Sequence, residues 1–162
     1  MVLLKRYGLP PVIAVALYTV TYALFGRGEA FLNPGALLAV LLALQIRVCD
    51  DLADYEADRQ RGKAPLSRST LIVLLIIMAL AIAATAIASR GCGMLIPLGL
   101  ILMQFALPGK YRDWLKPLFM PVIVVTLVWS FFEGNPWLWV VLPVLVAADV
   151  VLIVVNKTGR KV

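Results

Sequence analysis

The sequence predicts an all-α polytopic membrane protein, a bundle of about six transmembrane helices that forms a single domain over residues 1–162. Three observations lead to this prediction. Hydrophobic residues make up 62% of the chain and charged residues only 15%, whereas soluble domains contain about 45–50% apolar and about 25% charged residues. The apolar residues fall in long stretches, and the basic residues fall mainly between them on one side.

Six apolar stretches are candidate spans, since a span needs roughly 17–25 residues to cross about 30 Å of hydrocarbon. The first follows two basic residues, as a signal peptide does, but no small-residue cleavage site comes after it, so we expect a retained span. The fourth is short and contains Pro97 and Gln104. Pro121 and Pro143 lie inside the last two stretches and are expected to kink them. The stretches cover residues 8–25, 34–49, 69–89, 94–108, 114–132 and 137–156.

Lys and Arg are distributed unequally between the two sides of this predicted bundle. The side of the N-terminus carries 13 of the 15, and the other side carries Arg27 and Arg90. Because cytoplasmic loops are enriched in Lys and Arg, both termini and the loop at 50–68 are predicted to be cytoplasmic. We therefore expect an integral protein of the cell inner membrane, in contact with membrane lipid. The basic residues are spread over short loops, so no nucleic-acid partner is expected.

Two residue types exclude several kinds of site. The chain has no His, which excludes a His-based triad, a His-ligated zinc site and a His proton shuttle. Its two Cys residues are too few for a disulfide framework or a Cys-rich metal site. Any chemistry is therefore left to other side chains.

An acidic segment follows the second apolar stretch and contains five of the nine Asp and Glu residues within nine positions. On a helix with about 100° per residue, Asp54, Asp58 and Asp51 lie about 40°, 80° and 100° from Asp50. Arg47 lies on the same face, one turn earlier. Four aspartates therefore share one face where the second span meets water. Carboxylates one turn apart repel each other, so a cation is expected among them.

Mg²⁺ suits this arrangement, because it prefers oxygen ligands and is typically bound by one or two carboxylates together with substrate phosphates. That chemistry fits a phosphorylated lipid substrate. Basic side chains are also available for phosphate, which Arg binds with two parallel hydrogen bonds. These side chains are Arg47, Lys63, Arg68, Lys110, Arg112 and Lys116.

A solvated helix extension is the alternative interpretation of the acidic segment. Its acids would then pair with Arg59, Arg61 and Lys63 and would hold no ligand. Two features argue against this interpretation: the aspartates cluster on one face, and Asp is a weaker helix former than the Glu that a solvated helix favours.

The acidic segment resembles the first Asp-rich motif of the UbiA superfamily of intramembrane prenyltransferases. Residues 50–58, DDLADYEAD, are similar to that motif, N/D-D-x-x-D-x-x-x-D. Residues 62–68, GKAPLSR, look like the basic turn that follows the motif, and residues 111–116, YRDWLK, are similar to the family's Tyr…Leu-Lys segment. The resemblance covers the N-terminal part of the family and implies a UbiA-like half bundle.

The resemblance also implies an activity. Such an enzyme binds a polyprenyl diphosphate through Mg²⁺ at the cytoplasmic face, ionises it, and transfers the prenyl group to an acceptor. Metal and basic side chains stabilise the charge on the leaving diphosphate, and a water-poor pocket protects the allylic cation. Asp50, Asp54 and Asp58 would lie at the metal and Asp51 would support them, so that these four are the implied catalytic residues. The implied diphosphate-binding residues are Arg47, Lys63, Arg68, Tyr111 and Lys116.

A second Asp-rich motif, which family members carry in their later half, is missing from this chain. Beyond the acidic segment the acids are Asp113, Glu133 and Asp149. Three explanations stay open: a homodimer in which the partner supplies the second acidic helix, a separate subunit that supplies it, or a non-catalytic membrane assembly subunit that retains only the first motif. Asp149 is a further candidate, because a carboxylate within a span is costly.

Overall fold

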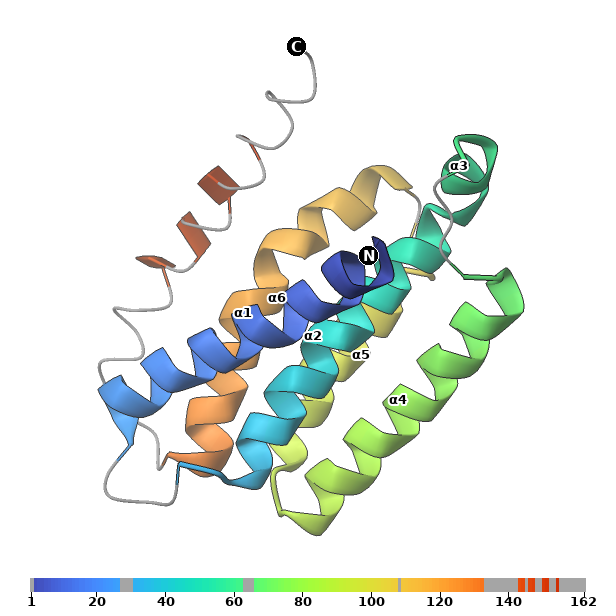
Figure 1. Cartoon of the computed structure of the whole chain (residues 1–162). Coiled ribbons are helices and arrows are strands. Elements are labelled where there is room, and N and C mark those ends of the chain that lie inside the picture. Colours follow the sequence, from blue (N-terminus) through green and yellow to red (C-terminus); the bar gives the residue numbers. More distant parts are fainter. Residues whose placement is uncertain are drawn as a thin grey trace.

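A computed structural model describes most of the chain, and within the described residues every regular element is a helix (Figure 1). The predicted all-α class is therefore confirmed for this part of the chain. The described residues are 2–26, 31–62, 66–107, 109–132, 143–144, 146–147, 150–151 and 154, with the side chains of 2–5 and 109–114 left out. The helices are α1 (Val2–Phe25), α2 (Pro34–Ala53), α3 (Tyr55–Gln60), α4 (Arg68–Ala88), the 3₁₀ helix η1 (Cys92–Met94), α5 (Leu95–Met103) and α6 (Gly109–Phe131).

Helix α1 begins at Val2, earlier than the predicted start at residue 8, and includes Pro10 and Pro11. Proline has no backbone N–H, so the carbonyls of Arg6 and Tyr7, four residues earlier, lack their helical donors. The side chains of Arg6 and Tyr7 contact an aspartate on α2. The predicted apolar stretch, 8–25, therefore lies within α1, and the candidate span Arg6–Phe25 begins two residues before it.

Helix α2 has a well-formed start and an interrupted end. The side chain of Asn33 accepts a hydrogen bond from the backbone of Gly35 at 2.8 Å, and Pro34 occupies the first helical position, where its missing donor costs little. At the other end, Asp54 adopts a turn conformation between α2 and α3. The Asp54 amide still donates to Asp50 (3.0 Å) and the Asp58 amide to Asp54 (2.9 Å). The acidic segment is therefore two helical pieces rather than one continuous helix.

The later helices lie close to their predicted positions. Helix α4 starts at the capping side chain of Ser67, which accepts from the backbone of Thr70 at 3.1 Å. The fourth predicted span is divided between η1 and α5 and ends at Met103. Helix α6 begins before the predicted residue 114 and continues through Pro117 and Pro121. The sixth predicted span, 137–156, falls largely outside the described residues.

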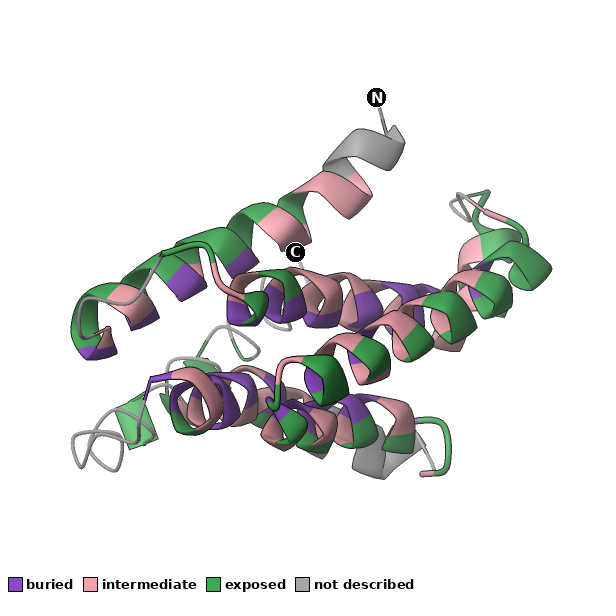
Figure 2. Cartoon of the chain, turned by 90° about the horizontal axis from the view of Figure 1, so that it is seen from below, coloured by how far each residue is buried: buried purple, intermediate pink, exposed green. Residues whose placement is uncertain are grey.

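Helix α2 occupies the centre of the bundle, where it packs against α1, α4, α5 and α6 (Figure 1). Leu38 and Leu42 of α2 are completely buried, and they join one apolar core to which the other long helices contribute. Figure 2 shows the buried positions on the inward faces of the helices and the exposed positions on their outer faces.

The outer faces of α1 and α4 are strongly apolar. The segments Arg6–Phe25 and Arg68–Ala88 are long and apolar enough to cross a membrane, yet only 22% and 17% of their apolar windows are buried. The apolar helices Cys92–Met103 and Leu115–Phe131 are shorter, and α2, with 20 residues, carries charged side chains in its last two turns. Two candidate spans are weak evidence for membrane association, and the predicted six-span arrangement is not confirmed.

The helices bring two different sets of side chains to the two ends of the bundle. We use the term charged end for the end that holds Arg6, Arg47, residues 50–58, Arg68 and Lys116, which come from α1, α2, α3, α4 and α6. We use the term aromatic end for the opposite end, which holds Tyr18, Tyr22, Phe31, Phe131 and Phe132.

Candidate functional site

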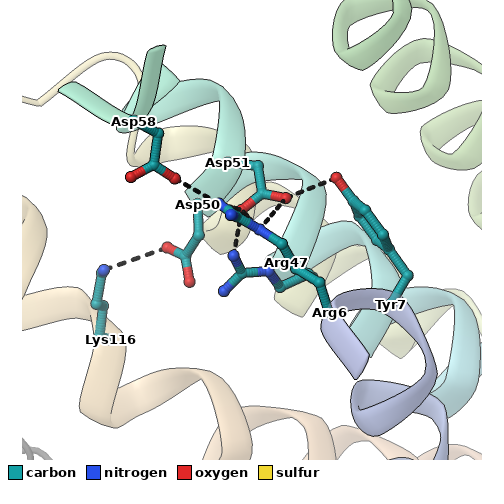
Figure 3. A network of polar contacts seen from close by, with 7 residues as sticks. All are labelled: Arg6, Tyr7, Arg47, Asp50, Asp51, Asp58 and Lys116. Carbon is teal, nitrogen blue, oxygen red and sulfur yellow. Dashed lines mark hydrogen bonds and ion pairs between the residues drawn. The ribbon is translucent and has the colours of Figure 1, made fainter. Parts of the chain in front are cut away.

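Asp51 is the centre of the polar contacts at the charged end. Its side chain is only 1% exposed. Arg6 donates to the carboxylate through Nη2 at 2.7 Å and through Nε at 3.0 and 3.1 Å, and the hydroxyl of Tyr7 donates at 2.6 Å. Arg47, one turn earlier on α2, forms a further ion pair with it (Figure 3). The buried charge is thus neutralised and hydrogen-bonded, as a buried carboxylate must be.

The same Arg6 guanidinium reaches a second carboxylate. Its Nη2 atom lies 2.5 Å from Oδ2 of Asp58 on α3, whose side chain is 19% exposed. Figure 3 shows the guanidinium between the two aspartates. The hydrogen bond from Arg6, together with its charge, holds the pKa of Asp58 below the ordinary value of an aspartate.

Asp50 turns toward α6 rather than toward this network. Its carboxylate lies 3.2 Å from Nζ of Lys116, and both side chains are partly exposed (Figure 3). Asp54, in the turn between α2 and α3, is exposed. Arg68 and Glu56 are 3.8 Å apart and both 66% exposed, so their ion pair contributes little.

The structure brings only some of the predicted site residues together. Arg47 lies beside Asp51, and Lys116 beside Asp50. The four aspartates do not converge on one point, and within the described residues no three acidic or Cys side chains form a group that could hold a metal. Lys63, the side chain of Tyr111 and Asp149 lie outside what the structure describes.

Sequence reasoning missed Arg6 and Tyr7 as members of this site. The sequence could have indicated these residues, because Tyr7 and Asp51 are separated from the connection between α1 and α2 by similar numbers of residues. In an antiparallel helix pair, residues equally far from the connection lie side by side. Both residues precede the predicted apolar stretch 8–25, and the sequence analysis counted Arg6 among the basic residues that set the orientation and did not consider Tyr7.

Mg²⁺ fits part of the predicted ligand set. Asp50 and Asp54 are one turn apart, and two carboxylates with substrate phosphates are a usual donor set for this ion. Asp51 does not fit as a ligand, because its buried carboxylate is already held by two guanidinium groups and a phenol. Asp58 is held by Arg6. Of the four predicted ligands, Asp50 and Asp54 are the two for which no contact with Arg6 is seen, and Asp50 lies against Lys116.

Two amide side chains lie in the interior near this end. Gln45 on α2 is fully buried and donates to the backbone carbonyl of Leu75 on α4 at 3.3 Å, an interhelical hydrogen bond. Gln104 is 1% exposed, and among the described residues no group meets the geometry of a hydrogen bond with its amide atoms. A buried polar atom without a partner costs about 1–3 kcal/mol. These amides make the interior beneath the charged end more polar than the rest of the core.

Comparison of the chain with protein-family models, curated proteins and solved structures finds no match. The similarity of residues 50–58 to the UbiA motif is therefore a similarity of short segments. The function has to be argued from the chemistry of the charged end and from the apolar faces of the helices.

Proposed function

We propose that this chain is an integral membrane protein that binds a polyprenyl diphosphate with Mg²⁺ at its charged end and transfers the prenyl group to an acceptor. The observation that carries the proposal is the carboxylate pair Asp50 and Asp54, with Lys116 at 3.2 Å from Asp50, at the polar end of an apolar bundle. The similarity of residues 50–58 to the first UbiA motif supports the same assignment.

The apolar surface supports the membrane location. The outer faces of α1 and α4 expose large side chains, among them Val12, Leu24, Leu80 and Ile87. Contiguous apolar surface of this kind is avoided in soluble monomers, and a core helix of a soluble protein would be mostly buried. We propose that lipid covers these faces, with the charged end and both termini at the cytoplasmic side of the inner membrane, because the sequence distribution of Lys and Arg favours that orientation.

The proposed roles follow from charge. Asp50 and Asp54 would hold Mg²⁺, which when bound supplies Lewis-acid stabilisation of the leaving diphosphate. The ammonium group of Lys116 lies beside Asp50 and would neutralise a phosphate oxygen there. Lys63, Arg68, Tyr111 and Arg47 are the further diphosphate-binding candidates that the motif resemblance proposes. The ion-paired Asp51 fixes the end of α2 against α1, so that the carboxylate pair keeps its position.

One chain contributes one such pair, whereas the resemblance implies two acidic helices. We propose that a second copy of the chain supplies the other pair in a homodimer, with a separate subunit as the alternative source. Dimerisation in lipid nanodiscs, together with a requirement for both copies to carry Asp54, would support the homodimer. A strictly monomeric active protein would exclude it.

A non-catalytic membrane assembly subunit is the second candidate function. The specific observation in its favour is that Arg6 and Arg47 already neutralise Asp51 and Asp58 within the chain, so much of the acidic segment needs no ligand. This candidate predicts no turnover and no binding of a prenyl diphosphate.

Binding and turnover of a radiolabelled prenyl diphosphate by the full chain in nanodiscs, with and without Mg²⁺, test the proposal. Asp54→Ala is expected to weaken Mg²⁺-dependent binding at least about tenfold, because one of two ligands is lost. Glu56→Ala, which removes an exposed acid two positions away, is the matched control and should bind as the wild type does. Equal binding by Asp54→Ala would contradict the proposal.

A further inference from the structure

We infer that the exposed arginines where α3 meets the start of α4 bind the headgroup of an anionic phospholipid, whose acyl chains lie along the outer face of α4. The inference rests on the membrane location in the proposed function and goes beyond the prenyl-transfer site. It gives a partner to three basic side chains that are all exposed, Arg59, Arg61 and Arg68.

The residue order in α4 determines the depth at which Arg68 would lie in a bilayer. The first turn of the helix is polar and exposed, with Arg68, Ser69 and Thr70, and residues 71–88 are apolar apart from Thr85. At a rise of 1.5 Å per residue this apolar part is about 27 Å long, close to the roughly 30 Å of a hydrocarbon core. Arg68 therefore lies at the level of the lipid headgroups when the apolar part fills the hydrocarbon.

One row of side chains on α4 connects this headgroup level to the apolar face. Three apolar residues follow Arg68 at intervals of four, which places all four side chains along one ridge of the helix; they are Ile72, Ile76 and Leu80. All four side chains are exposed, and Leu80 is 65% exposed. A lipid whose phosphate contacts Arg68 therefore meets apolar surface for its acyl chains along the same ridge.

Helix α3 adds positive charge at the same level. Its Glu56 carboxylate lies 3.8 Å from the guanidinium of Arg68, so α3 lies beside the start of α4 (Figure 1). Arg59 lies three residues after Glu56 and therefore on the same side of α3, and Arg61 caps the end of that helix. Guanidinium groups from two helices thus lie at one corner of the bundle.

The carboxylates of α3 do not cancel this charge. Asp58 is neutralised by Arg6, at 2.5 Å. The pair of Glu56 with Arg68 is weak, because both side chains are 66% exposed. The corner therefore keeps an excess of positive charge. Arg binds a phosphate with two parallel hydrogen bonds, and basic residues at a membrane surface attract anionic lipids. A zwitterionic lipid carries its own cation beside the phosphate, so an anionic headgroup is favoured.

Native mass spectrometry of the full chain in detergent, with phosphatidylglycerol or phosphatidylcholine of the same acyl chains and without prenyl diphosphate, tests the inference. We expect phosphatidylglycerol to bind at least about fivefold more tightly, since one basic side chain near an anionic lipid contributes about that factor. Arg68→Gln should lower the affinity for phosphatidylglycerol about fivefold and leave the affinity for phosphatidylcholine unchanged.

Arg90→Gln is the matched control, because Arg90 is exposed just beyond the opposite end of α4 and its loss changes the net charge equally. If Arg90→Gln weakens the binding of phosphatidylglycerol as much as Arg68→Gln does, net charge explains the binding and the inference is overturned. Equal affinities of the wild type for the two lipids would also overturn it and leave the membrane location standing. A chain that binds neither lipid and does not enter nanodiscs would contradict both the inference and the proposed membrane location.

Discussion

The charged end and the aromatic end of the bundle are held together by opposite means. At the aromatic end, the rings of Tyr18, Tyr22, Phe31 and Phe132 have centroids 5.2–6.5 Å apart. The ring of Phe131 lies so close to Gly91 that an added Cβ would be 2.4 Å from its Cζ atom. At the charged end, the helices meet through ion pairs that span α1, α2, α3 and α6.

This difference indicates at which end of the bundle side chains can exchange one contact for another. Beside Gly91 the packing leaves no space for an added atom, because a Cβ there would already clash with the ring of Phe131. Ion pairs at a partly exposed surface can change partners at little cost, because water and other charges compensate. The buried Asp51 is the exception at the charged end, since it behaves like a core residue. The following predictions test this comparison, from the largest expected effect to the smallest.

Asp51→Ala should destabilise the protein most, by about 3–5 kcal/mol, because it leaves Arg6 and Arg47 without their buried partner. Thermal unfolding in detergent measures the loss. Glu56→Ala removes an exposed carboxylate from the same segment and should change stability by less than about 0.5 kcal/mol. Similar losses in both variants would mean that Asp51 is no more important to the fold than a surface acid.

Gly91→Ala should cost about 2 kcal/mol through overpacking against Phe131 at the aromatic end. The same unfolding assay applies. Gly99 on α5 has no atom within 4 Å of an added Cβ, so Gly99→Ala is the matched control and should be neutral or stabilising. A neutral Gly91→Ala would show that Phe131 moves aside easily and would weaken the contrast between the two ends.

Lys116→Gln should affect the binding of a prenyl diphosphate more than it affects the stability of the fold. Its ion pair with Asp50 is partly exposed, so unfolding should change by at most about 1 kcal/mol. If the proposed function holds, Mg²⁺-dependent binding of a prenyl diphosphate should fall about tenfold, because the cation proposed to neutralise a phosphate oxygen is lost. Large destabilisation without loss of binding would assign Lys116 to the fold instead of the site.

The smallest effect concerns pH. Arg6 lowers the pKa of Asp58 in the folded protein, so the carboxylate contributes stability at neutral pH that is lost as the pH falls below the ordinary aspartate value of about 4. Asp58→Asn should remove this contribution, so its stability should depend less on pH below that value than the wild type's does. Identical acid profiles for the two proteins would argue against the Arg6–Asp58 pair.

Local sequence patterns predicted the parts of the structure that depend on local interactions. The starts of α2 at Pro34 and of α4 at Arg68 match the predicted apolar stretches 34–49 and 69–89. Local patterns did not predict the contacts of the charged end, because the ion pairs Arg6–Asp51 and Asp50–Lys116 join residues from separate helices. The turn at Asp54 was also missed, because helical periodicity carries no information about where a helix is interrupted.

The two prolines of α1 have a consequence for how the ends communicate. Without donors from Pro10 and Pro11, the turn that carries Arg6 and Tyr7 is joined to the rest of α1 by fewer backbone hydrogen bonds than any ordinary helical turn. We expect a displacement of that turn to bend α1 at the two prolines and not to shift the whole helix along its axis. We therefore expect a rearrangement of the ion pairs to leave the packed rings of the aromatic end in place.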